Sequence, residues 1–278
     1  MKTIVAHLSV DLDAISSAWL IRRYMPGWED AKLKFVNAGE TLNGMKPDSD
    51  PDIIHVDTGL GMFDHHQQRD MHMSAAKKVF DYLDKNDLIR KHDVEPLSRM
   101  VELIAGIDNF QEVYFPSPDA DIYDFGIHQA ITGLRPIIEE DSERCELMFK
   151  VLDAILIVFK NKIRAEHEIK DAFTFKSKWG KTFAIESQNE ETVKLAQKKG
   201  FEMVIRKDPK LGFLRIKTIP SEERDLTPLY ERLKKEDPDA DWFLHISKNM
   251  LLNGSSKNPK VKASRLPLNK VIDIVRNI

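Results

Sequence analysis

The sequence predicts an α/β protein with a larger parallel-sheet domain and a smaller C-terminal α/β domain, joined by a long helix. Apolar runs of strand type alternate with helical patterns, one helical pattern continues from Asp141 to about Ala172, and the alternation then resumes. The chain has 278 residues, more than one domain usually contains. We therefore predict two domains, residues 1–172 and 173–278.

The first domain opens with a βα unit. Strand-type runs cover residues 2–8 and 51–59, and helical patterns cover residues 13–24, 75–89, 96–107 and 141–172. The first helical pattern places Ala14, Ala18 and Ile21 on one side. Asp141 is a candidate N-cap for the last helix, which closes the domain.

The second domain repeats the alternation on a smaller scale. Strand-type runs cover residues 181–187, 201–207, 212–219 and 241–247, and helical patterns cover residues 189–200 and 225–236. Such an alternation is typical of an α/β unit.

Composition narrows the class of protein. The longest apolar run, residues 154–159, is far shorter than the roughly 20 residues of a membrane span. The N-terminus turns acidic too early for a signal peptide, and Cys145, the single cysteine, excludes an internal disulfide framework. We expect a cytoplasmic protein that does not bind membranes.

Charge is divided unequally along the chain. Residues 175–278 carry 22 Lys and Arg against 14 Asp and Glu, whereas residues 1–174 carry 20 against 31. An acidic part suits cations and a basic part suits a polyanion, although a solvated surface of mixed charge also accounts for such counts.

Acidic and imidazole side chains follow the first predicted strand. The stretch "HLSVDLD" places His7, Asp11 and Asp13 where this strand passes through a loop into a helix. In open parallel sheets, ligands bind at the carboxyl ends of the strands. If the segment stays extended, Asp11 and Asp13 project to the same side and repel unless a cation neutralises them. The alternative is a helix N-cap and a core histidine.

The second predicted strand ends in the same way. Asp57 follows its apolar run, and the turn "TGLG" brings Asp64, His65 and His66 back toward the same edge. Asp108 directly follows another apolar helical stretch. Together these oxygen and imidazole groups suit manganese, iron, zinc or magnesium.

These motifs resemble those of a known superfamily. "HLSVDLDA", "HVDTG", "FDHHQ" and "GIDNF", in this order and spacing, resemble the four motifs of the DHH phosphoesterases. That superfamily includes RecJ-type exonucleases, nanoRNases, cyclic-dinucleotide phosphodiesterases and manganese pyrophosphatases. "DTGLGMFDHHQ" and "LHISKNMLLNG" look most like the branch of melanocyte-proliferating-gene-type hydrolases and exonucleases.

The resemblance implies two divalent metal ions that share a bridging carboxylate. Manganese is the expected metal, with magnesium, cobalt, iron and zinc as alternatives. The first ion would be held by His7, Asp11 and Asp57, and the second by Asp13, Asp57, His65 and Asp108.

The two remaining residues of the "FDHHQ" motif would act beside the metals. The resemblance implies that Asp64 orients a ligating imidazole and that His66 faces the scissile phosphate. Two cations roughly 3.5–4 Å apart lower the pKa of a shared water and hold the attacking and leaving oxygens.

A basic segment near the C-terminus is the expected substrate-binding part. Glycine and serine let backbone N–H groups approach a phosphate, and lysines neutralise it, although an exposed basic loop has the same composition. Arg135 of the first domain is a further candidate. The candidates in the second domain are His245, Lys248, Asn253, Gly254, Ser255, Ser256 and Lys257.

We therefore expect a metal-dependent phosphodiester hydrolase, an exonuclease or nanoRNase, that binds short single-stranded oligonucleotides or nucleotides in a cleft between the two domains. A homodimer is possible. One alternative is a manganese-type pyrophosphatase or polyphosphatase. The other, from a different class, is a nucleotide-binding sensor without turnover.

Overall fold

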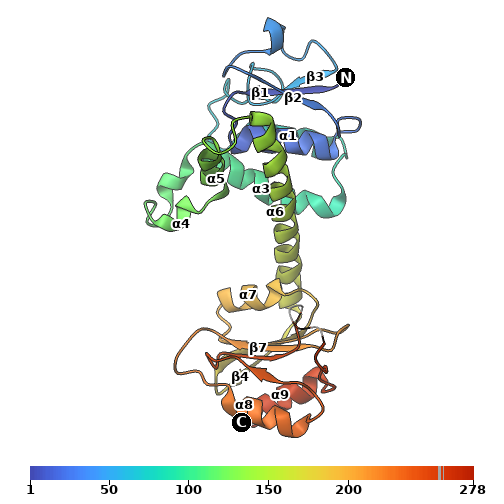
Figure 1. Ribbon diagram of the computed structural model, residues 1–278, viewed down its shortest axis with the longest axis vertical. Helices are drawn as coiled ribbons and strands as arrows, with labels where there is room; N and C mark the ends of the chain where they lie inside the picture. The colour runs from blue at the N-terminus through green and yellow to red at the C-terminus, as the bar shows by residue number, and fades with distance from the viewer. Residues whose placement is uncertain (256–257, 259) are drawn as a thin grey trace. The chain divides into compact units, whose positions relative to one another are not determined.

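The chain forms two compact units, Met1–Lys160 and Asn161–Ile278. The computed structural model describes residues 1–255, 258 and 260–278 (Figure 1). The units divide within the long helix α6 (Asp141–Lys170), whereas the predicted boundary after residue 172 lies just beyond that helix. The predicted α/β class is confirmed, because each unit contains a sheet covered by helices. Among the described helices, none combines the length and the apolar character needed to cross a membrane.

The first unit is built on a three-stranded parallel sheet. Strand β1 (Thr3–His7) lies between β2 (Lys32–Val36) and β3 (Ile53–His55). Lysines alternate with apolar residues in β2, and the sequence analysis did not recognise it as a strand. The predicted strand 51–59 is shorter than expected, because its backbone turns at Asp57, which has a φ of +54°.

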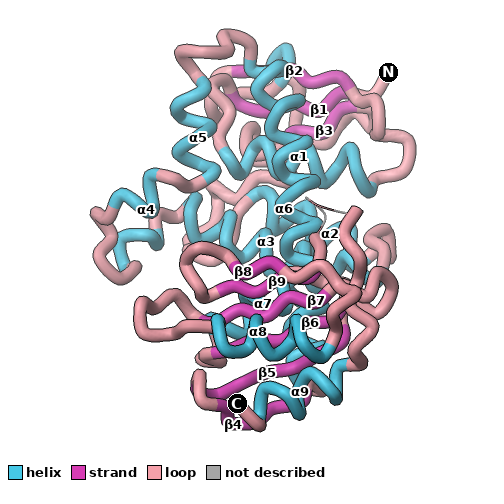
Figure 2. The backbone as a smooth tube through the Cα atoms, turned by 60° about the horizontal axis from the view of Figure 1, so that its bottom comes forward, coloured by secondary structure: helices cyan, strands magenta, loops and turns pink. Residues whose placement is uncertain are grey.

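Helices lie against this sheet (Figure 2). The apolar residues of the sheet and the helices form one buried cluster. Ala14, Ala18 and Ile21, which were predicted to share one side of the first helix, are all buried. Short 3₁₀ turns occur at η1 (Leu42–Gly44) and η2 (Gln111–Tyr114). The α-helices are α1 (Leu12–Tyr24), α2 (Ala75–Lys85), α3 (Lys91–Asp108), α4 (Asp121–Asp124), α5 (Ile127–Leu134) and α6.

Asp141 at the start of α6 holds the loop after β1. Its carboxylate accepts hydrogen bonds from the backbone N–H groups of Ser9 and Val10, at 2.9 and 3.0 Å. Arg144, one turn further along α6, donates to the same carboxylate. The predicted N-cap residue therefore fixes a loop 131 residues away in sequence, in which Ser9 has a left-handed φ of +57°.

Replacing Asp141 by asparagine should loosen this loop. Charge-assisted hydrogen bonds are stronger than neutral ones, and we expect the free energy of unfolding to fall by about 1–3 kcal/mol. Thermal unfolding measured by circular dichroism tests this. Glu143→Ala removes an exposed carboxylate from the same helical turn and should leave the unfolding temperature nearly unchanged. An equal loss in both variants would contradict a specific role of Asp141.

The second unit contains a six-stranded mixed sheet. Its strand order is β4-β5-β6-β7-β9-β8, and only β5 and β6 are parallel. Helix α7 (Glu191–Lys198) connects these two strands. The strands are β4 (Phe173–Ser177), β5 (Gly180–Glu186), β6 (Met203–Lys207), β7 (Leu214–Thr218), β8 (Phe243–Leu244) and β9 (Met250–Asn253).

The two faces of this sheet bury separate apolar clusters. Helices α8 (Thr227–Glu236) and α9 (Leu268–Arg276) cover one face, and α7 covers the other. The predicted strand 241–247 is only the two-residue β8. Its antiparallel partner β9 and the helix α9 were not predicted.

Candidate metal centre

His7 and Asp11 stand at the carboxyl end of the central strand. His7 is the last residue of β1, and Asp11 is the N-cap of α1, where its carboxylate accepts a hydrogen bond from the N–H of Ala14 at 3.0 Å. The other oxygen of Asp11 lies 3.6 Å from His7 Nε2. The N-cap alternative that the sequence left open thus applies to Asp11 rather than Asp13.

Asp13 is buried in the first turn of α1. The sequence analysis considered an extended segment from Asp11 to Asp13, but α1 begins at Leu12 and the segment is not extended. The Asp13 carboxylate accepts hydrogen bonds from the N–H groups of Ala75 and Ala76, at 2.7 and 2.8 Å. These orphan donors begin α2, so the end of this helix holds Asp13 in place.

Asp57 lies between the two histidines of the cluster. One carboxylate oxygen is 3.2 Å from His7 Nε2, and the other is 3.4 Å from His65 Nε2. Its backbone N–H donates to the carbonyl of Phe63, which closes the turn behind it. Gly59 in that turn has a φ of +78°, and a Cβ there would lie 2.7 Å from the Thr41 side chain.

His65 and Asp108 complete the cluster on its other side. Asp108 is the last residue of α3, and its carboxylate lies 3.3 Å from His65 Nε2. The same nitrogen is 3.7 Å from Asp13. The six predicted ligands therefore lie together, with Asp57 among the other five. They come from β1, the loop that follows it, α1, the loop that follows β3, and α3.

His66 has a different carboxylate partner from His65. Its Nδ1 lies 2.7 Å from Asp64, which also accepts hydrogen bonds from the backbone N–H groups of Leu60 and His66. The contact of Asp64 is with His66 and not with His65, and it fixes the His66 ring. The His66 side chain is 58% exposed, against 12% for His65.

The cluster concentrates like charges in a buried place. Burial, with the charges of Asp57 and Asp108, raises the pKa of Asp13 well above its usual range, and burial raises that of Asp108 to about 6. The neighbouring Asp11 and Asp57 carboxylates raise the pKa of His7 to about 11, and the neighbouring Asp57 carboxylate raises that of His65 to about 9. In the absence of cations, the groups of this cluster therefore keep their protons to a higher pH than usual.

These residues fit two divalent cations. Among the described residues, Asp57 Oδ1 and His65 Nε2 are buried without a hydrogen-bond partner, although they face each other. Ligands of one octahedral ion at about 2.1 Å lie about 3 Å apart, close to the separations found here. Three sets of ligand atoms lie within 4.8 Å of one another: His7, Asp11 and Asp57; Asp13, His65 and Asp108; and Asp57, His65 and His66.

Metal binding should release protons and strengthen as the pH rises. The raised pKa values of His7 and His65 mean that both rings are protonated at pH 7, and a cation must displace these protons to bind their nitrogens. Titration of the chelator-treated protein with Mn²⁺ in two buffers of different ionisation enthalpy counts the protons released. An affinity that does not change between pH 6 and pH 8 would contradict this.

A small cavity opens beside the cluster. It has a volume of about 190 Å³ and is lined by Asp11, Asp13 and Asp108 together with residues of α3 and α5, among them Ile107 and His128. Arg135, the predicted phosphate contact, donates to the carbonyl of Ser9 at 3.1 Å. It therefore supports the same loop as Asp141.

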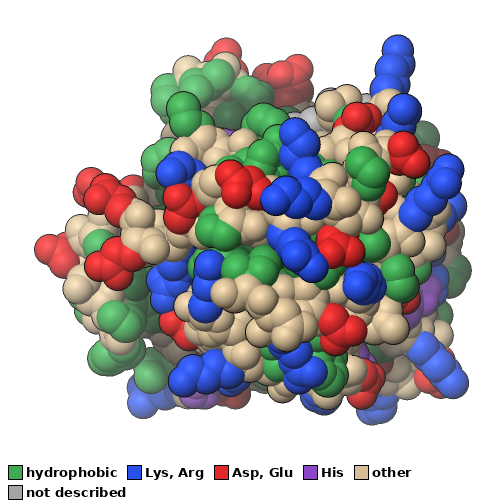
Figure 3. Space-filling model, turned by 90° about the horizontal axis from the view of Figure 1, so that it is seen from below, with side chains coloured by type: hydrophobic (Ala, Val, Ile, Leu, Met, Phe, Trp, Pro, Cys, Tyr) green, Lys and Arg blue, Asp and Glu red, His purple; other side chains and the backbone are tan. Residues whose placement is uncertain are grey.

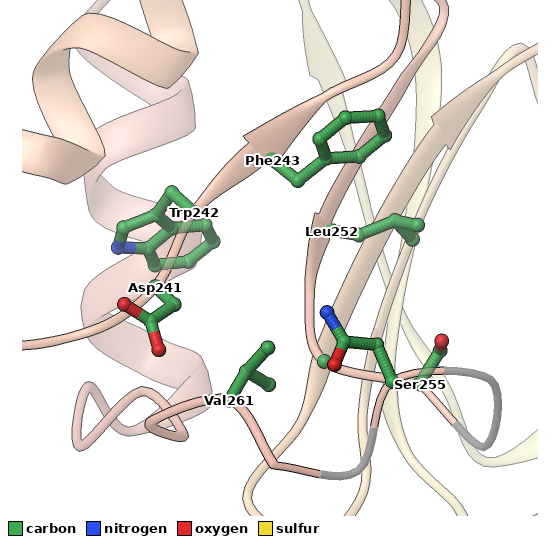
Figure 4. Close-up of a pocket in the computed structure, with 8 residues that line it drawn as sticks. Asp241, Trp242, Phe243, Leu252, Ser255 and Val261 are labelled. Carbon is green, nitrogen blue, oxygen red and sulfur yellow. The ribbon is translucent and has the colours of Figure 1, made fainter.

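The predicted substrate-binding residues of the second unit occupy different places. Gly254 and Ser255 line a cavity of about 480 Å³. Figure 4 shows this cavity, with Phe243 and Leu252 next to each other on the paired strands β8 and β9 and Asp241 on another side. Ser256 and Lys257 lie outside the described residues.

The other predicted residues there are engaged within the unit. Lys248 forms an ion pair with Asp225 at 2.7 Å, and His245 lies 2.8 Å from the hydroxyl of Ser247. The buried Asn253 amide binds the backbone at residues 241, 262 and 264, so it positions the segment that follows it. Lys and Arg side chains lie among acidic and apolar ones on the face shown in Figure 3.

Comparisons with known proteins were made at the level of families, curated sequences and solved structures. No model of a known protein family matches the chain, and no curated protein matches it. The chain is similar to a solved structure whose title describes the DHH domain of a member of a family of ribosomal proteins. The match covers 99% of this chain and 86% of that one, with 10% sequence identity and a TM-score of 0.34.

Proposed function

We propose that this chain is a phosphoesterase that uses two divalent metal ions to hydrolyse phosphodiesters in short oligonucleotides. The observation that carries the proposal is Asp57, whose two oxygens face His7 Nε2 at 3.2 Å and His65 Nε2 at 3.4 Å. A carboxylate in this position suits a bridge between two cations. The resemblance of the four motifs to those of DHH phosphoesterases supports the same function.

The residues around Asp57 would form two metal-binding sites. His7 and Asp11 would hold one ion, and Asp13, His65 and Asp108 would hold the other. Bound there, two divalent cations, with manganese the expected metal, would activate a water and stabilise the charge that develops on the phosphate oxygens. The buried Asp13 and the half-buried His7 restrict the access of bulk water to this place.

His66 would contact the scissile phosphate. Because Asp64 binds its Nδ1 at 2.7 Å, the ring is held with its Nε2 edge facing away from Asp64. The exposed position of this ring, 58% of the side chain, leaves it accessible to a ligand. A fixed polar group close to the reacting phosphate stabilises charge at little cost in reorganisation.

A panel of substrates tests the proposal. The protein is incubated with Mn²⁺ and end-labelled di- to decanucleotides, cyclic dinucleotides, 3′-phosphoadenosine phosphate and pyrophosphate, and the products are separated. Stepwise shortening of oligonucleotides supports the proposed exonuclease or nanoRNase activity. Hydrolysis of pyrophosphate alone would replace it by a pyrophosphatase, and bound metal without any hydrolysis would indicate a nucleotide-binding sensor.

The basic second unit is proposed to bind the phosphates that do not react. Lys260 and Lys262 are exposed and close in sequence to the Gly254–Ser255 cavity. Replacing both by alanine should weaken oligonucleotide binding and reduce the slope of log K against log salt by about 0.7 for each phosphate that is no longer neutralised. Lys234→Ala with Lys235→Ala, two exposed lysines of α8, is the matched control. Equal slopes in the two double variants would assign the Lys260 and Lys262 side chains to solvated surface.

A further inference from the structure

A second cavity of the first unit adjoins the metal centre. It has a volume of about 350 Å³, within the range of small-molecule sites, and lies at the end of α3, beside η2, α4 and α5. The lining residues that matter below are Glu102, Gln111, Glu112, Phe115, Phe125 and His128.

This cavity is a neighbour of the one beside the metal ligands. Ile107 and His128 line both, and Asp108, one of the six clustered residues, follows Ile107 directly at the end of α3. A ligand whose phosphate lies at the metal centre therefore has a second, larger space next to it. What fills that space depends on the chemistry of its walls.

Aromatic side chains form one part of the wall and are open to solvent. Phe115 is 39% exposed and Phe125 is 94% exposed, and the Phe115 ring lies 5.6 Å from that of Tyr123. Soluble proteins rarely leave several large apolar side chains exposed together without a use for them. Exposed aromatic faces are suitable platforms for stacking a planar base.

Hydrogen-bond acceptor groups form another part of the cavity wall. Glu102 and Glu112 both line the cavity; Glu102 forms an ion pair with Lys77, and Glu112 lies 3.0 Å from His128 Nε2. Among the residues that line this cavity, none is a lysine or arginine. Carboxylates would repel a further phosphate, but they accept hydrogen bonds from the amino groups of nucleobases, as they do from the amino group of cytosine in DNA complexes.

We propose that this cavity binds the nucleobase of the nucleotide whose phosphate the metal centre holds. The inference rests on the proposed phosphodiesterase function and deepens it, because it selects a substrate with bases over inorganic polyphosphate. A base with an exocyclic amino group, such as cytosine or adenine, would stack on Phe125 and Phe115 and donate to Glu112. A uracil, which presents a carbonyl oxygen at that edge, should bind less well.

The test compares one substrate with and without its bases. Wild-type protein, Phe125→Ala and the control Tyr114→Ala are assayed with Mn²⁺ on a cytidine dinucleotide and on the same phosphodiester between abasic sugars. Tyr114 is 81% exposed and is not among the residues that line the cavity. In Phe125→Ala the ratio of kcat/KM for the two substrates should fall about tenfold, and in Tyr114→Ala it should not change.

Binding measured without turnover separates this inference from the proposed function. Equilibrium dialysis of cytidine monophosphate and uridine monophosphate should give a preference for cytidine in the wild type, and Phe125→Ala should weaken the binding of cytidine monophosphate about tenfold. If the wild type hydrolyses the dinucleotide and the abasic diester equally well, the base site is overturned and the phosphodiesterase stands. If neither diester is hydrolysed, the proposed function fails, whatever the dialysis gives.

Light scattering on the same variants tests whether this apolar surface is instead an interface between copies of the chain. A change of oligomeric state in Phe125→Ala, with equal losses on both substrates, would make this face an interface between copies of the chain and would overturn the base site. An unchanged molar mass together with the tenfold fall in the ratio supports it.

Discussion

Asp57→Asn should abolish most of the activity while the protein still folds. The substitution removes the negative charge between His7 and His65, and with it the neutralisation that lets two dications lie close together. We expect phosphodiester hydrolysis to fall by several orders of magnitude and the bound metal to drop below two ions per chain. Metal analysis and kinetics of the purified variant measure both.

Asparagine is chosen because it suits the backbone at this position. Asp57 has a φ of +54°, in the left-handed region that asparagine adopts more readily than most residues. The fold should therefore be retained, as circular dichroism can verify. Asp52→Asn, an exposed aspartate just before β3, is the matched control and should keep full activity. Near-normal turnover in a folded Asp57→Asn protein would rule out the dimetal assignment.

The fold class and the gathering of the acidic groups were accessible from the sequence for a simple reason. Parallel strands bring their carboxyl ends to one edge, so polar residues after β1 and β3, such as Asp11 and Asp57, had to come close together. Apolar periodicity also marked α1 and α6. The parallel sheet and the long helix are confirmed.

Other features depend on contacts that sequence patterns do not record. Asp141 has the pattern of a helix cap, but its carboxylate binds Ser9 and Val10 across 131 residues. Asn253 was predicted as a phosphate contact, but its amide is buried among backbone groups. Strand β2 escaped prediction because its lysines break the apolar run. In each case a tertiary contact, rather than the local sequence pattern, determines the structure.

The cavity beside α4 was also missed. Its aromatic residues lie in short turns without the periodicity that draws attention to a helix or strand. The "FDHHQ" motif, in contrast, identified both histidines but did not predict which carboxylates each ring contacts.

His65→Ala should lose metal, and His66→Ala should keep it. His65 Nε2 lies within 3.7 Å of carboxylate oxygens of Asp13, Asp57 and Asp108, and only 12% of its side chain is exposed. Removing this ring takes a ligand from the second ion and leaves three carboxylates to repel one another. We expect one ion per chain to be lost and activity to fall as far as in Asp57→Asn.

His66 is bound through its Nδ1 to Asp64 and lies outside the densest part of the carboxylate cluster, although that nitrogen is still 3.8 Å from Asp57. If its role is to contact the phosphate, His66→Ala should retain two ions and lower kcat about 10²- to 10³-fold, the usual effect of losing one group that stabilises the transition state. Metal analysis of both variants, done beside the kinetics, decides between the roles. Equal metal loss in the two variants would mean that both rings are ligands, and the phosphate contact would then have to come from another side chain.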